Sequence, residues 1–199
     1  AVDPALGYSL KQLAYAGYAM ASFNTDYASF NWRGNAGIRG VYSRFEGEGV
    51  RQVSGPDGRI EVVPQSTASS DTEWLPSANL AITSNSLPDL VLRLAAARVM
   101  TRPRPAQLSP TATLSTNDMS LMRGNPDLKP FVANQVDAGV EYYFGDRKEG
   151  LVALALFHKD IENFVEPVAV IEPVVVSPGQ TAEDTLVSTY ANGGKGRVS

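Results

Sequence analysis

Six segments of this chain place apolar residues at every second position. The clearest runs from Gln135 to Phe144, where valine, alanine and aromatic residues alternate with polar residues and glycine. A period of two puts the two sets on opposite faces of an extended strand. The other five segments are Gln12–Asn24, Asn31–Arg44, Glu73–Thr83, Leu90–Thr101 and Leu151–Val165. The sequence therefore predicts about six strands, the last of which is apolar on both faces as far as Phe157.

The connections between these strands alternate between short and long. Phe45–Thr72 and Arg102–Ala133 are long and polar, the first with a turn signal at Gly55–Gly58, and a third long connection follows the last strand. Loops of about thirty residues are uncommon inside compact soluble domains. Short turns at one end and long loops at the other are typical of up-and-down outer-membrane barrels, here as three hairpins. The short turns are Thr25–Phe30, Ser84–Asp89 and Gly145–Gly150.

Aromatic residues lie near the ends of the apolar faces. Trp32 and Tyr42 are ten residues apart on one face, which is about 25 Å along a membrane normal for a strand tilted near 40°. The apolar band of an outer-membrane barrel has that height. We therefore predict an all-β fold of antiparallel, up-and-down transmembrane β-barrel strands. The predicted membrane girdle consists of Trp32, Tyr42, Trp74, Tyr142 and Phe144.

The amino-acid composition and the net charge argue against several classes of function. The 199 residues are 43% hydrophobic and 19% charged, as in a folded protein. A net charge of -4 argues against a nucleic-acid partner. With no cysteine and with His158 as the single histidine, we predict no metal site and no cofactor. No spanning helix or signal peptide is visible, and six strands with polar inner faces cannot close a barrel, so we expect a fragment of a larger barrel.

Seven short motifs together resemble the C-terminal barrel of TonB-dependent outer-membrane receptors. Their order and spacing match across nearly the whole chain, although the family usually has an aromatic residue where His158 stands. The motifs are Ala-Gly-Tyr-Ala-Met at 16–20, Arg33-Gly-Asn-Ala-Gly-Ile-Arg39, Trp74-Leu-Pro-Ser-Ala-Asn-Leu80, Thr101-Arg-Pro103, Arg123-Gly-Asn-Pro-Asp-Leu-Lys-Pro130, Val140-Glu-Tyr-Tyr-Phe144 and Phe157-His-Lys-Asp-Ile-Glu-Asn-Phe164.

The resemblance implies a location, a function and partners. Residues 1–199 would be part of a barrel domain in a Gram-negative outer membrane, with the plug domain, the TonB box and the remaining strands outside this chain. The whole receptor would bind a scarce nutrient (a carbohydrate, a siderophore or similar) and import it with force from the TonB complex, which acts through the missing plug region. Its partners would be outer-membrane lipid, TonB and the nutrient. No covalent step is implied, so we expect no enzyme and no catalytic residue.

Two groups of polar residues are candidates for contacts in such a barrel. Polar side chains on the inner faces of the strands are expected to face the lumen or the plug. Long loops carry recognition, so their charged and amide side chains are the candidate ligand contacts. The lumen set is Arg33, Asn35, Arg39, Asn79, Arg93, Asp137 and Glu141. The loop set is Arg102, Arg104, Asn117, Asp118, Arg123, Asn125 and Asp127.

Two other classes of protein stay open. A soluble β-sandwich that binds carbohydrate would also contain strands with one apolar face. A secreted β-rich hydrolase would use paired carboxylates, and Asp160 and Glu162 share a face because they are two residues apart on a strand. The alternation of short turns and long loops argues against both.

Overall fold

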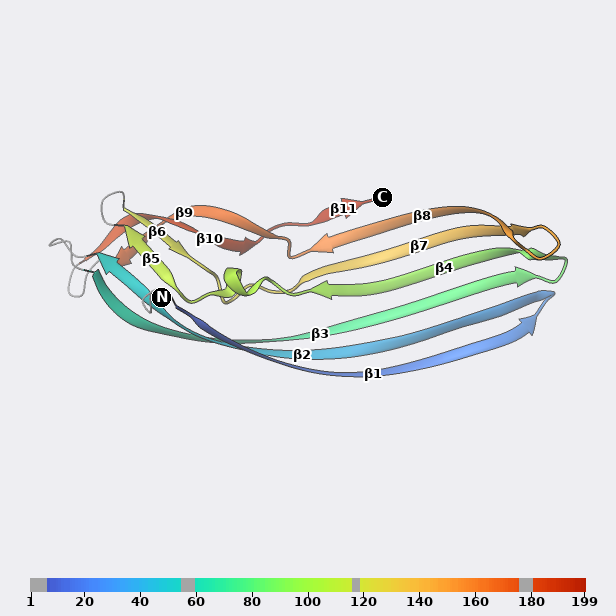
Figure 1. Ribbon diagram of the computed structural model, residues 1–199, viewed down its shortest axis with the longest axis horizontal. Helices are drawn as coiled ribbons and strands as arrows, with labels where there is room; N and C mark the ends of the chain where they lie inside the picture. The colour runs from blue at the N-terminus through green and yellow to red at the C-terminus, as the bar shows by residue number, and fades with distance from the viewer. Residues whose placement is uncertain (1–6, 55–59, 116–118, 176–180) are drawn as a thin grey trace.

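The computed structural model describes residues 7–54, 60–115, 119–175 and 181–199 (Figure 1). These residues form one sheet of eleven strands, so the prediction of about six strands is wrong in number. One short 3-10 helix, η2 (Pro105–Leu108), interrupts the strands. The strands are β1 (Ser9–Tyr27), β2 (Phe30–Ser54), β3 (Ile60–Ser84), β4 (Leu87–Thr101), β5 (Ala112–Ser115), β6 (Ser120–Arg123), β7 (Phe131–Phe144), β8 (Gly150–Glu162), β9 (Val165–Val175), β10 (Ala182–Asn192) and β11 (Gly196–Val198).

The six predicted segments form the wall strands β1, β2, β3, β4, β7 and β8. They pair antiparallel in the order β1-β2-β3-β4-β7-β8, and β11 adds three residues to the outer edge of β8. The three short turns lie together at one end of the sheet, which we call the turn end (Figure 1, right). The wall therefore has the predicted up-and-down wiring. The sixth segment ends at Glu162, three residues before the predicted boundary.

The first long connection is mostly strand. Strands β2 and β3 continue without interruption beyond the wall and stay paired from Phe30–Ser84 to Ser54–Ile60. The prediction of a polar loop at Phe45–Thr72 is therefore wrong, and the predicted turn at Gly55–Gly58 lies outside the described residues. Here backbone hydrogen bonds hold the pair together and no apolar face is needed, so the sequence lacks the alternation that marks the wall strands.

The other two long connections also fold into strands. The segment between β4 and β7 contains η2, β5 and β6, and the segment after β8 contains the β9–β10 hairpin and β11. Strand β5 pairs parallel with the extension of β2 at Arg51–Val53, beyond Glu48, which is the β2 residue opposite the first residue of β1, Ser9. Strand β6 pairs parallel with β10. We call η2, β5, β6, β9 and β10 the cap, which lies opposite the turn end (Figure 1).

The register aligns the apolar residues of the wall strands on one face. Leu80 of β3 lies opposite Leu94 of β4, which lies opposite Ala138 of β7, and the pattern continues to Leu156 of β8. Most of the large apolar side chains of this apolar face are exposed, and Trp32, Leu80 and Ile82 are half-buried. Among the exposed ones are Tyr15, Phe23, Ile38, Tyr42, Trp74, Leu92, Leu94, Val136, Val140, Tyr142, Phe144, Val152, Leu154 and Leu156.

No second sheet covers the apolar face in the described parts of the chain, because all of their strands belong to one sheet. A β-sandwich needs two packed sheets, so the soluble sandwich does not describe this structure. Soluble monomers rarely expose apolar patches larger than a few hundred Å². Within the described ranges, no helix has the length and apolar character needed to span a membrane.

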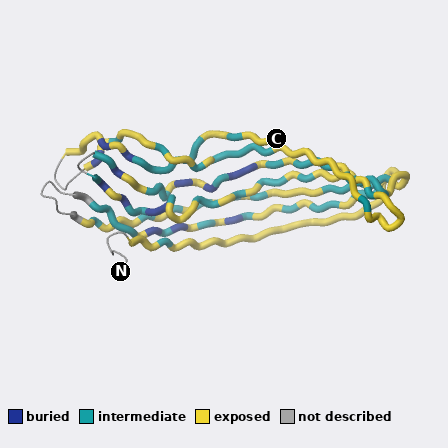
Figure 2. Tube along the Cα trace, turned by 45° about the horizontal axis from the view of Figure 1, so that its top comes forward, coloured by how far each residue is buried: buried dark blue, intermediate teal, exposed yellow. Residues whose placement is uncertain are grey.

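Buried residues concentrate near the cap (Figure 2). One core joins β5 and β6 to β9 and β10, and its members are Ala112, Leu114, Leu121, Val174 and Val187. A second core packs Leu108 and Leu128 of the connection between β4 and β7 against Phe45 of β2. Burial of this kind supplies the main driving force for folding in water. The cap thus has apolar cores of its own, whereas none of the described segments covers the apolar face of the wall.

Candidate functional site: the cap cavity and the polar face

The connection between β4 and β7 folds onto the polar face of the wall. The Arg102 guanidinium donates to Ser43 Oγ of β2, with Nη2 at 3.0 Å and Nε at 3.2 Å. Ser69 Oγ of β3 donates to the backbone oxygen of Pro126 at 3.1 Å. Ser43 and Ser69 belong to the set of β2 and β3 residues that faces away from the apolar side chains. The connection therefore lies over the mouth of the polar face at the cap end.

A small cavity of about 180 Å³ remains beneath this connection. Two residues of the predicted loop set, Arg102 and Asp127, line it together with Asp71 of β3 and Lys129. The cavity therefore brings two cationic and two anionic side chains to the point where the connection meets the wall.

A larger cavity of about 670 Å³ lies between the β2–β3 extension and the strands of the cap. Its charged lining residues are Arg51, Arg123, Asp127 and Glu172. Arg123 Nη2 and Glu172 Oε2 form an ion pair at 2.8 Å. Arg51 donates from Nη2 to the backbone oxygen of Val175, and its Nε is buried with no partner among the described residues. The cavity thus presents hydrogen-bond donors and acceptors with balanced charge.

Asparagine side chains hold the two sides of this cavity together. Asn192 at the end of β10 accepts from the Lys129 amide at 2.8 Å and donates to the Lys129 carbonyl oxygen at 3.1 Å. It also donates to Asn163 O at 3.1 Å. Asn125 donates to the backbone oxygen of Tyr190 at 2.8 Å. We call Asn125 and Asn192 the clamp, because they join the connection between β4 and β7 to β10.

Replacing Asn192 with alanine is expected to release the Lys129 segment from β10. Each lost hydrogen bond contributes about 0.5–1.5 kcal/mol. We expect the Lys129 amide, which donates to Asn192 Oδ1, to exchange with deuterium faster in the variant. Asn192→Asp is the comparison variant, since it keeps an acceptor for the Lys129 amide while it removes the donors and adds a negative charge. Unchanged exchange at Lys129 in Asn192→Ala would show that the clamp does not hold this segment.

The predicted loop set is divided among several environments. Arg123, Asn125 and Asp127 line the larger cavity, and Asp127 also lines the smaller one with Arg102. Asn125 is occupied by protein contacts, since Oδ1 also accepts from the Asp127 amide at 3.0 Å. The exposed Arg104 lines neither of the two cavities and precedes η2, where its amide donates to Gln107 Oε1. The predicted residues Asn117 and Asp118 lie outside the described residues.

Other residues that line the larger cavity were not in the predicted set. Arg51 and Gln65 belong to the β2–β3 extension, for which the sequence predicts a loop. Glu172 and Tyr190 belong to β9 and β10. A signal for β9 was present, because Val165–Val175 is rich in valine and such a run favours a strand. The pairing that brings these strands to the cavity has no comparable signal in the sequence.

The predicted lumen set lies on the polar face of the wall. The register puts Asn35 opposite Asn79, and Asn79 Nδ2 donates to Asn35 Oδ1 at 3.0 Å. Arg93 Nε and Glu141 Oε1 form an ion pair at 2.7 Å. These residues, except Glu141, border a cavity of about 640 Å³ that also includes Arg33. Arg39 and Asp137 share the polar face, from β2 and β7.

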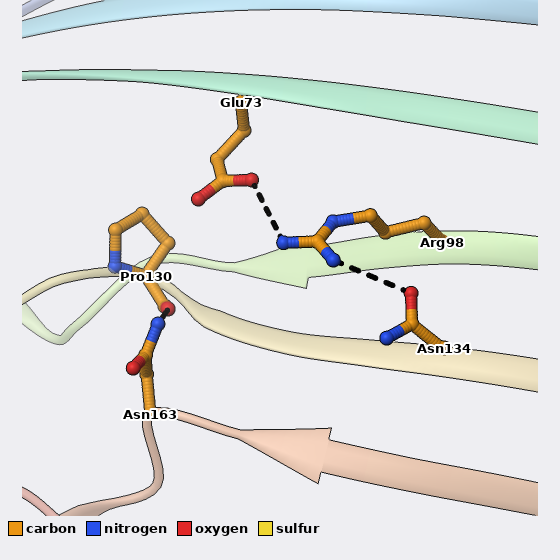
Figure 3. A network of polar contacts seen from close by, with 5 residues as sticks. All are labelled: Glu73, Arg98, Pro130, Asn134 and Asn163. Carbon is orange, nitrogen blue, oxygen red and sulfur yellow. Dashed lines mark hydrogen bonds and ion pairs between the residues drawn. The ribbon is translucent and has the colours of Figure 1, made fainter.

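An ion pair lies where the apolar face of β4 ends, on the side of the cap. Arg98 interrupts the apolar positions of this strand and contacts Glu73 Oε2 at 3.5 Å and Asn134 Oδ1 at 3.4 Å (Figure 3). The same view shows Asn163 donating to the backbone oxygen of Pro130. The apolar positions of β4 therefore end a few residues before the cap end of this strand, and polar contacts begin there.

The predicted girdle residues occupy the apolar face at two levels. Tyr142 and Phe144 stack at the turn end, with ring centroids 6.4 Å apart. Trp32 lies near the same end, two residues after the start of β2. Tyr42 and Trp74 lie toward the cap end and are exposed. The aromatic residues thus form two levels separated by smaller apolar side chains.

The paired carboxylates of β8 contact basic residues on the β11 side. Arg197 Nε donates to Asp160 Oδ1 at 3.0 Å, and Lys195 Nζ lies 3.2 Å from Glu162 Oε1. His158 Nε2 lies 3.6 Å from Asp160 Oδ2. Across the described segments, no group of three or more His, Cys, Asp and Glu side chains could hold a metal ion. Nothing in this arrangement resembles the cleft that a paired-carboxylate hydrolase needs.

Comparison with known families decides the identity of this wall. The family described as TonB dependent receptor-like, beta-barrel matches residues 3–199. The chain belongs to this family. The resemblance seen in the sequence motifs is therefore confirmed, and the family is one of receptors and transporters rather than enzymes. No curated protein matches the sequence.

Solved receptor structures share the fold of this TonB-dependent receptor barrel. A double mutant of the ferric enterobactin receptor PfeA of Pseudomonas aeruginosa is 18% identical to this chain, with a TM-score of 0.55. The match covers 96% of this chain and 32% of PfeA. The hemophore receptor HasR of Serratia marcescens, solved with its hemophore HasA and heme, is 11% identical with a TM-score of 0.53, covering 96% and 38%. The chain thus spans about a third of the length of these receptors.

Proposed function

We propose that this chain forms part of the barrel wall and the extracellular mouth of a TonB-dependent receptor in a Gram-negative outer membrane. The observation that carries the proposal is the single sheet, with an exposed apolar face between two aromatic levels and all three short turns at one end. Lipid would cover the apolar face, and the aromatic residues would lie at the two headgroup levels. The turn end would face the periplasm, and the cap would face the outside.

The rest of the receptor would complete the barrel and its plug. The solved receptors of this fold are about three times longer than this chain. Among the described residues strand β1 pairs only with β2, so its other edge would be available for a further wall strand. A plug domain would lie against the polar face, where Arg33, Arg93 and Glu141 are accessible to it. Residues 1–199 would accordingly be one part of a barrel domain.

The nutrient would bind at the cap cavity before import. One of the two named relatives is a ferric enterobactin receptor, and the other is a hemophore receptor solved with its hemophore and heme. In this chain the cavity of about 670 Å³ offers Arg123, Asp127 and Glu172 to a polar ligand. Both a siderophore and a carbohydrate fit these polar groups. TonB would then supply the force that admits the ligand through the plugged barrel.

Uptake by the full-length receptor tests this proposal. Cells that depend on the receptor would be given iron-loaded siderophores or labelled oligosaccharides, with TonB present or deleted. We expect one class of ligand to accumulate only when TonB is present. The Arg123→Ala, Glu172→Ala double variant should lower ligand binding about ten-fold or more, because charged hydrogen bonds are lost. Lys195→Ala is the control, since Lys195 lies away from the cavity. Uptake that is equal without TonB would overturn the proposal.

A further inference from the structure

The two asparagines of the clamp differ in the residue that follows them. Asn192 precedes Gly193 and is the one asparagine of the chain that precedes a glycine. Asn125 precedes Pro126, whose nitrogen carries no proton. Asparagine is chemically labile, because the backbone nitrogen of the next residue can attack its side-chain carbonyl carbon. A glycine nitrogen does so most readily, since no side chain obstructs its approach. Asn192 is therefore the labile half of the clamp.

The closed clamp keeps both reacting groups in hydrogen bonds. Asn192 Oδ1 accepts from the Lys129 amide at 2.8 Å, and Nδ2 donates to Lys129 O and to Asn163 O, both at 3.1 Å. The Gly193 nitrogen must lose its proton before it can attack, and it donates that proton to Phe164 O at 2.5 Å. Asn192 and Gly193 are also half-buried. The reaction therefore requires a local opening of the cap that breaks these bonds.

The product of the reaction does not fit the closed clamp. A carboxylate oxygen would replace Nδ2, and it has no proton to donate to Lys129 O and Asn163 O. These two backbone oxygens would lose their donor and would repel the new charge. The Glu166 carboxylate adds a second negative charge, because it lies beside Gly193, where an added Cβ would be 2.4 Å from Glu166 Oε1. The product therefore opposes reclosure.

We propose that Asn192 is a site of spontaneous deamidation that opens the clamp irreversibly. During a local opening, hydroxide removes the proton of the Gly193 nitrogen, and this nitrogen forms a bond to Asn192 Cγ. The bond from Cγ to Nδ2 breaks, and Nδ2 takes a proton from water and leaves as ammonia. Water then opens the resulting succinimide ring, which gives aspartate or isoaspartate. Afterwards only Asn125, which donates to Tyr190 O, joins the connection between β4 and β7 to β10 as part of the clamp.

Peptide mapping of the full-length receptor by mass spectrometry, after ageing at mildly alkaline pH, tests the proposal. A synthetic peptide of residues 187–197 has no clamp and gives the unprotected rate. We expect Asn192 to deamidate about ten-fold or more slowly in the receptor than in the peptide, because the hydrogen bonds of the clamp must open first. The deamidated receptor can be separated by its added negative charge. In that fraction we expect the Lys129 amide to exchange with deuterium faster than in the unmodified receptor.

Two glycine variants provide the controls. Gly193→Ala should slow deamidation several-fold in both receptor and peptide, since the methyl group hinders ring closure. In the receptor the nearest neighbour of this methyl group is the flexible Glu166 carboxylate, and unaltered exchange at Lys129 before ageing shows that the clamp is closed. Gly194→Ala makes the same change one residue later, where an added Cβ meets no heavy atom within 4 Å, and should leave the rate unchanged.

Three results would overturn the proposal. They are equal deamidation rates in the receptor and the peptide, an aged receptor without deamidation at Asn192, and unaltered Lys129 exchange in the deamidated fraction. None of these measurements depends on which nutrient the receptor imports, so failure here is distinguishable from failure of the proposed function.

Discussion

Replacing Ala96 with arginine is expected to lower the free energy of unfolding by about 2–4 kcal/mol, the cost of a cation on the lipid side near the middle of a bilayer. Ala96 lies on the apolar face and pairs with Ala78, which pairs with Ala36. Ala36 is close to midway between the two aromatic levels on β2. An arginine there would have to reach the headgroups or remain in hydrocarbon.

The neighbouring residue provides a matched control for this change. Ala95 lies on the opposite, polar face of the wall, where it pairs with Asn79 and Asp137. Ala95→Arg introduces the same side chain on the polar face beside the Asp137 carboxylate, so we expect little loss of stability. Equilibrium unfolding of the full-length receptor in lipid vesicles, with its abundance in the outer membrane, measures the difference. Equal losses at the two positions would contradict the assignment of lipid to the apolar face.

Replacing Gly124 with valine is expected to distort the cap by forcing η2 away from the adjoining strand. An added Cβ would lie 2.5 Å from Ser109 O, 2.8 Å from Ser109 N and 2.9 Å from Gln107 O. These are backbone atoms and cannot rotate aside. Overpacking of this kind costs about 1–3 kcal/mol. The Asn125 amide donates to Gln107 O at 2.7 Å, and we expect this bond to weaken.

Hydrogen exchange at the Asn125 amide measures the distortion in this variant directly. Ligand binding measures its functional effect, because Gly124 lines the larger cavity. Gly194→Val is the matched control, since an added Cβ at Gly194 meets no heavy atom within 4 Å. We expect the control to exchange and bind as the unmodified receptor does. Protection of Asn125 that is unaltered in Gly124→Val would show that η2 can move without cost.

The wall could be predicted from the sequence because one physical requirement repeats along each of its strands. Val136, Val140 and Tyr142 share a face that no other described segment of the chain covers, so every second position must be apolar. The position where the apolar pattern ends can also be read from the sequence, since Arg98 breaks the pattern where contacts with Glu73 and Asn134 begin. Period-two reasoning thus locates a strand wherever its two faces meet different environments.

The cap could not be predicted in the same way. Gly47 and Gly49 lie within the β2 extension, where composition indicates a loop but pairing with β3 continues. The parallel contact of β6 with β10 joins segments far apart in the chain, and nothing local encodes it. The candidate site has the same limit. Arg123 belongs to the predicted set because long loops carry recognition, whereas Glu172, its ion-pair partner, lies in β9, a strand that is absent from the prediction.

The core that joins β5 and β6 to β9 and β10 has a consequence for the order of assembly. Leu114 and Leu121 are buried against Val174 and Val187, which are made much later in synthesis. The hairpins of the wall, in contrast, form between neighbours in sequence. Because distant contacts carry a larger entropic cost of chain closure, we expect the wall hairpins to form first. Until β10 pairs with β6, Leu114 and Leu121 remain open to water, and the cap is the last part of this chain to become complete.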